Sequence, residues 1–85
     1  MPHHKSAAKR VITNARARER NVAARSRMRS AVKAVRAATT RSTAETAYRA
    51  ASIVLDRTAA KGIIKRETAN RQKSRLAKFT HKLPA

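Results

Sequence analysis

Residues 16–36 read RARERNVAARSRMRSAVKAVR, and this stretch predicts one long, uninterrupted helix. It contains neither Gly nor Pro, the two residues that most often break a helix. On a helix with about 3.6 residues per turn, mostly small and apolar residues recur here at alternating steps of four and three, so they share one narrow stripe. This stripe, the apolar seam, consists of Ala17, Asn21, Ala24, Met28, Ala31, Val35 and Ala38. We expect the helix to pack on other protein through the seam.

Two rows of cations run along the same helix, one on each side of the seam. The first row consists of Arg18, Arg25, Arg29 and Arg36, and the second of Lys9, Arg16, Arg20 and Arg27. At about 100° per residue, each row stays within roughly 20° of one line along the helix. Only a polyanion would satisfy so many fixed cations along one rod, so the rows predict a polyanionic partner.

The composition favours a nucleic acid as that partner. The 85 residues hold 22 Lys and Arg against 4 Asp and Glu, a net charge of +18, and Arg outnumbers Lys by 14 to 8. The planar guanidinium group grips phosphate with two parallel hydrogen bonds, whereas the Lys ammonium acts as a point charge. Self-repulsion at this net charge opposes a compact state unless a partner compensates it. The excess of Arg therefore indicates a structured nucleic acid.

Helix start and stop signals divide the chain into an arm and three helices. We expect a single domain over 1–85, with a flexible arm over 1–5 and helices over 7–38, 43–61 and 66–83. Ser6 can cap the first helix, and Ser42 and Glu45 have capping-box spacing at the start of the second. Gly62 fits the left-handed residue that ends the second helix, and Pro84 stops the third.

Large apolar residues are few, because Ala dominates a hydrophobic fraction of 41%. We therefore expect an all-α fold of long, narrow, closely packed helices with a thin core. Leu55, Leu76 and Phe79 of the second and third helices should meet Met28 or Val35 of the first in that core.

The first half of the long helix has little protein to pack on, because Ala17 is the only apolar seam residue before Asn21. We expect this half to project from the bundle onto the partner. Asn21 itself has two interpretations that stay open: it marks where protein packing ends, or it hydrogen-bonds to RNA. Ser26 and Ser30 lie beside the Arg rows and are favoured as phosphate contacts.

Several kinds of function are not expected from this sequence. It has no carboxylate pair, no catalytic triad pattern and no phosphate-binding Gly loop, so we expect no enzyme and no small-molecule substrate. It has no Cys for a disulfide or a thiolate metal site. His3 and His4 could chelate Cu(II) or Ni(II) only if Met1 were removed, and we expect neither a metal nor a cofactor. No signal peptide and no membrane span are expected, which favours the cytoplasm.

The small number of aromatic residues limits the ways in which the protein can recognise a nucleic acid. One isolated Tyr48 is no base-stacking platform, so we expect it in the core and expect readout of shape and backbone in double-helical RNA or in DNA. His81 lies off the seam and is expected in solvent or near phosphate. An alternative is a DNA-compacting, histone-like protein. A membrane-active helix is disfavoured because the apolar face is an Ala-rich seam.

The sequence also resembles the S20 family of bacterial small-subunit ribosomal proteins over nearly its whole length. The resemblance lies in Lys5-Ser6-Ala7, Lys9-Arg10, Arg20-Asn21, Arg25-Ser26, Arg29-Ser30, Lys33, Asp56, Ala59-Ala60-Lys61-Gly62, Ile64, Ala69, Arg71 and Lys73-Ser74-Arg75-Leu76. After Ile64 the family usually has His, a basic residue and Asn, where this chain has Lys65, Arg66 and Glu67. That departure affects the usual cap of the third helix and any RNA contact of that His and Asn.

The resemblance implies a three-helix bundle with a long, extended first helix. It implies a structural constituent of the ribosome that binds small-subunit ribosomal RNA directly and early in assembly, within the 5′ domain and against the long stem near the 3′ end. It implies few if any protein partners and no cofactor. The predicted RNA-binding residues are Lys5, Ser6, Lys9, Arg10, Arg16, Arg18, Arg20, Asn21, Arg25, Ser26, Arg27, Arg29, Ser30, Lys33, Arg36, Lys61, Lys65, Arg66, Arg71, Lys73, Ser74, Arg75 and Lys78.

Overall fold

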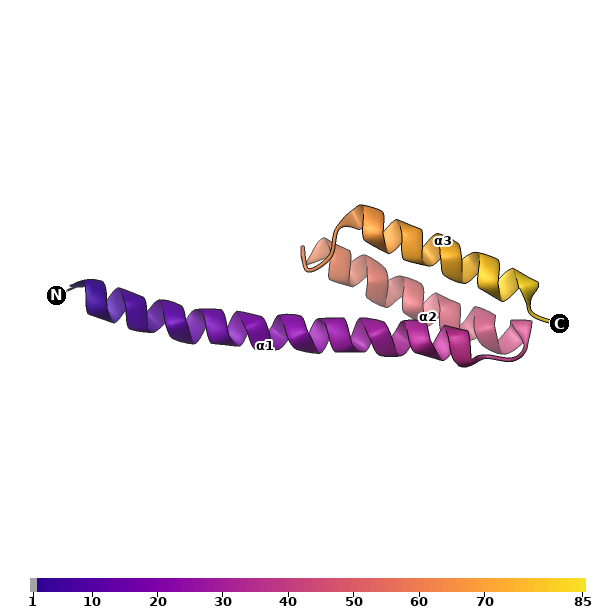
Figure 1. The fold of residues 1–85 in the computed structure, drawn as a ribbon, viewed down its shortest axis with the longest axis horizontal. Helices are drawn as coiled ribbons and strands as arrows, with labels where there is room; N and C mark the ends of the chain where they lie inside the picture. Colours follow the sequence, from indigo (N-terminus) through magenta and orange to yellow (C-terminus); the bar gives the residue numbers. More distant parts are fainter. Residues whose placement is uncertain (1) are drawn as a thin grey trace.

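Three helices, two short connections and a short segment after the last helix make up residues 2–85. The computed structural model describes residues 2–85, with side chains from Ser6 onward. The helices are α1 (Pro2–Ala37), α2 (Arg41–Ala60) and α3 (Arg66–Lys82), and residues 2–85 contain no strand. α2 lies between α1 and α3, which barely touch each other (Figure 1). The prediction of an all-α three-helix bundle with a long first helix is confirmed.

The first helix begins earlier than the sequence signals predict. It starts at Pro2, so Ser6 lies inside the helix and does not cap it. Proline suits the first helical position, because its missing N–H would have no partner within the helix there. Of the arm expected over residues 1–5, Met1 and the side chains of residues 2–5 lie outside the described part of the chain. At its other end α1 stops at Ala37, one residue before the predicted end.

The cap of α2 differs from the predicted capping box of Ser42 and Glu45. Thr40 has the extended backbone of a capping residue, with φ −120° and ψ 154°, and its side-chain oxygen accepts a hydrogen bond from the Thr43 amide at 3.4 Å. The helix therefore begins at Arg41 rather than near Thr43, and Ser42 lies in its first turn. Thr40 caps the helix in place of Ser42, because its hydroxyl oxygen accepts a hydrogen bond from an amide that has no partner within the helix.

Gly62 ends α2 in the left-handed conformation that the sequence predicts, with φ 76°. Its amide donates a hydrogen bond to the carbonyl of Ala59 at 2.9 Å, and the amide of Ile63 donates one to the carbonyl of Thr58 at 3.2 Å. These two hydrogen bonds form a Schellman motif, which satisfies carbonyls at the helix end. α3 then starts after Lys65, whose side chain makes no capping hydrogen bond.

The core is small and lies along α2. Val35, Leu55 and Leu76, one residue from each helix, are its largest fully buried side chains. Ala51 and Ala69 complete the buried cluster, while the partly buried Met28, Tyr48, Phe79 and other apolar side chains pack against it. The predicted meeting of Leu55, Leu76 and Phe79 with Met28 and Val35 is confirmed. The Ala side chains explain how the helices come close without a large core.

Half of α1 projects beyond the other two helices, which gives an elongated molecule of 67 × 20 × 12 Å (Figure 1). Residues 6–16 are all exposed, including Val11 at 69% and Ile12 at 54% of their full accessible surface. Burial begins at the half-buried Ala17 and is complete at Ala24 and Val35. The projection that the sparse seam predicts is therefore present.

Candidate nucleic-acid interface

The two cation rows of α1 lie on its solvent-exposed surface. All members of both rows are exposed, while the seam between them turns Ala24 and Val35 into the bundle. Within the described side chains, the only ion pair joins Lys73 and Asp56, so the acids of the protein neutralise no cation of α1 there. Charges fixed this way on one rod produce a strong positive potential along its length.

Asn21 and two of the predicted arginines border a groove where α1 leaves the bundle. This groove of about 450 Å³ is lined by Ala17, Arg20, Asn21, Ala24, Arg27, Lys61 and Ile63. Lys61 comes from the end of α2, forty residues after Asn21 in the chain, and the fold brings it beside the second cation row. The exposed side chain of Asn21 is compatible with both of its interpretations.

Arg25 has a structural contact besides its exposed position. Its guanidinium donates to the carbonyl of Ile63 at 3.5 Å, which joins α1 to the turn between α2 and α3. The contact is long and therefore weak. Arg29, one turn further along the same row, is exposed and gives a cleaner test of the row.

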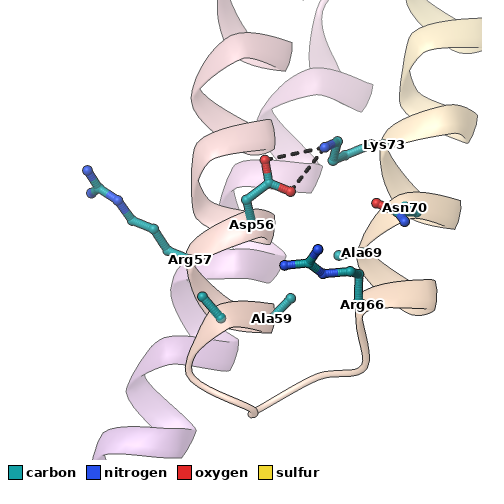
Figure 2. A pocket seen from close by; sticks show the side chains of 8 residues that line it. Asp56, Arg57, Ala59, Arg66, Ala69, Asn70 and Lys73 are labelled. Carbon is teal, nitrogen blue, oxygen red and sulfur yellow. Dashed lines mark hydrogen bonds and ion pairs between the residues drawn. The ribbon is translucent and has the colours of Figure 1, made fainter.

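The predicted residues of α3, together with Lys65 directly before it, divide into two groups. Lys65, Arg66, Arg71, Ser74, Arg75 and Lys78 are exposed. Lys73 is half-buried, and its ammonium lies 3.0 Å and 3.3 Å from the two carboxylate oxygens of Asp56 on α2 (Figure 2). Lys73 therefore offers less of its charge to an external phosphate than its neighbours do.

The remaining predicted residues all lie on the surface except one whose side chain is not described. Ser6, Arg10, Ser26, Ser30, Lys33 and Lys61 are exposed, and Lys5 falls outside the described side chains. The exposed Arg57 is not among the predicted residues, because it stands on the mixed-charge helix α2. It lines a groove with Arg27 and Lys61, a proximity that only the fold reveals.

The described residues contain neither a candidate metal-binding group nor a helix that could span a membrane. The described residues contain no group of three or more His, Cys, Asp or Glu side chains placed to hold a metal ion. None of the described helices has the length and apolarity needed to span a bilayer. His3 and His4 lie outside the described side chains, so their chelation stays untested.

The fold and the charged surface define a class of small, strongly basic, elongated helical proteins with two rows of exposed cations along the first helix. The family model of ribosomal protein S20 matches residues 2–81, which include the projecting half of α1 as well as the bundle. The chain belongs to the ribosomal protein S20 family, a family of structural ribosomal proteins rather than of enzymes.

Individual relatives match along nearly the whole chain. The small ribosomal subunit protein bS20 of Levilactobacillus brevis is 51% identical over 79 residues, which cover 91% of this chain and 94% of that protein. The protein of the same name from Shouchella clausii is 47% identical over 88 residues and covers both chains completely. That of Nitrosomonas eutropha is 44% identical over 80 residues, or 91% of this chain and 92% of its own.

Proposed function

We propose that this protein is a ribosome-bound structural component of the small subunit that binds small-subunit ribosomal RNA directly and stabilises its folded form during assembly. The 5′ domain and the long stem near the 3′ end are the RNA elements proposed as its targets. The exposed cation rows of α1 carry the proposal, because they run along a helix that projects from the bundle over half its length and lies within the range that the family model matches. The names of the relatives support the small subunit as the place of action.

Phosphate contacts account for the binding mechanism. Each guanidinium group that meets a phosphate releases condensed counterions, so affinity falls as salt rises. Two rows on opposite sides of one rod grip phosphates along its length and hold the RNA strands in fixed positions. This backbone contact needs no catalytic group, and it stabilises whichever RNA fold presents phosphates at the matching spacing.

Salt-dependent filter binding to a transcript of the 5′ domain tests the proposal. Arg29→Ala should weaken binding, and the removal of one guanidinium–phosphate interaction should reduce the slope of log affinity against log salt by about 0.7 to 0.9. Arg49→Ala is the matched control, because Arg49 is also exposed but lies on α2, outside both rows. An Arg29→Ala slope equal to that of the control would contradict phosphate binding by this row.

Partner preference separates RNA binding from DNA compaction. We expect saturable binding of the ribosomal transcript and weaker, unsaturable coating of duplex DNA of equal length. Equal affinity for the two would favour the histone-like alternative. Sedimentation of the native protein with the small ribosomal subunit provides the corresponding measurement in cell extracts.

A further inference from the structure

A groove between the end of α2 and the start of α3 combines chemistry that the cation rows lack. It has a volume of about 540 Å³ and an apolar lining of Ala59, Ala60 and Ala69. Its polar lining is made by Asp56, Arg57, Arg66, Asn70 and Lys73. Figure 2 shows Arg66 extending from α3 towards α2 below Asp56, while Arg57 points away from the space between the helices. The grooves along α1 are lined by cations and neutral side chains, whereas this one also contains a carboxylate.

The ion pair of that carboxylate contributes little to the stability of the fold. The side chains of Lys73 and Asp56 are 29% and 58% exposed, and pairs so open to water add little to folding free energy. Lys73 does hold the carboxylate in place through both of its oxygens. A carboxylate has about four lone-pair positions, so Asp56 keeps acceptor sites for further N–H donors.

These groups are suited to a nucleobase rather than to a bare phosphate. A phosphate placed directly against Asp56 would meet its negative charge, whereas a base at the same position can donate N–H groups to it. The methyl groups of the half-buried Ala59 and the exposed Ala60 offer a small apolar surface to the face of a base, and the exposed amide of Asn70 adds a donor and an acceptor. Arg66 at the edge can hold the phosphate of the same nucleotide.

We propose that this groove binds one unpaired, unstacked nucleotide of RNA, with its base against Ala59 and Ala60, its N–H edge on Asp56 and its phosphate on Arg66. This proposal deepens the proposed function and rests on it, because it adds a site of base readout to a surface that otherwise reads phosphates. Guanine is the base expected to bind best, since it carries two adjacent N–H donors on one edge that can pair with the two oxygens of a carboxylate.

Nucleotide titrations of the full chain, followed by nuclear magnetic resonance, test the groove without ribosomal RNA. Guanosine 5′-monophosphate should shift the methyl signals of Ala59 and Ala60 and the side-chain amide of Asn70. It should bind there about fivefold or more tightly than ribose 5-phosphate, which carries the same phosphate but no base. Equal affinity of the two ligands, or guanosine shifts confined to α1, would overturn the proposal and leave phosphate binding by the cation rows intact.

Charge-matched variants locate the effect. Asp56→Asn keeps the shape of the side chain and should remove most of the preference for the nucleotide over ribose 5-phosphate. Glu45→Gln makes the same change in charge at an exposed position of α2 outside the groove and should retain the preference. Asn70→Ala is a second groove variant, chosen because Ala is the best helix former and so favours the helix α3. It should reduce the affinity for guanosine 5′-monophosphate by about threefold. Full preference in both groove variants would refute the site.

Discussion

Leu76→Ala should remove a large part of the stability of this protein. Leu76 is 1% exposed and belongs to a cluster with only two other large, fully buried side chains, Val35 and Leu55. The change deletes three buried carbon groups at about 0.8 kcal/mol each, and the residual cavity adds on the order of 1 kcal/mol, for a total of about 2 to 4 kcal/mol. Small domains are stable by only about 5 to 15 kcal/mol.

The expected destabilisation is measurable by thermal unfolding, followed by circular dichroism in moderate salt. At about 4 to 8 °C per kcal/mol for a domain of this size, the midpoint should fall by roughly 10 to 30 °C. Ile53→Ala is the matched control, because Ile53 is also a large apolar residue but is 52% exposed, and it should cost no more than about 1 kcal/mol. If both variants unfold at the same temperature, Leu76 does not carry the core.

Two further predictions concern the backbone. Gly62→Ala should lower stability by about 1 kcal/mol in the same unfolding assay, because φ is 76° and no atom lies within 4 Å of the added methyl group, so only the left-handed conformation opposes it; an unchanged midpoint would show that the turn relaxes without cost. The amides of Lys9 to Arg18 should exchange rapidly in the free protein at low salt and become protected on RNA, because like charges and a missing core disfavour the free helix there. Strong protection without RNA would mean that this part of α1 is preformed.

The sequence predicts the helices and the core because their signals are local and repeated. The apolar positions of the seam of α1 recur over many turns, and Gly62 is the only glycine in the sequence, so it marks the end of α2 without a competing position. Leu55 and Leu76 are among the few large apolar residues of α2 and α3, so burial has few alternatives. Caps are less predictable, since Thr40 and Ser42 offer the same hydroxyl chemistry two residues apart and the backbone geometry decides between them.

Interactions between distant residues are the part that sequence reasoning misses. Arg41 donates through its backbone to the carbonyl of Pro84 at 2.8 Å and through its guanidinium to that of His81 at 3.0 Å, which fastens the end of the chain to the start of α2. Lys73 likewise forms an ion pair with Asp56 of another helix, although its charge suggests a phosphate contact. No periodicity encodes such pairs, because they depend on how the helices are placed against each other.

The unbroken course of α1 also decides the rotation of its projecting half about the helix axis. A helix turns by about 100° and rises about 1.5 Å per residue. Ala24 and Val35 are held in the bundle, so they orient Arg16 and Arg18 from about two to five turns away. The number of residues between the bundle and these arginines therefore sets the direction in which they point. One residue inserted there would rotate them about the helix axis by more than a quarter turn, whereas seven inserted residues would return them to within about 20° of their original direction.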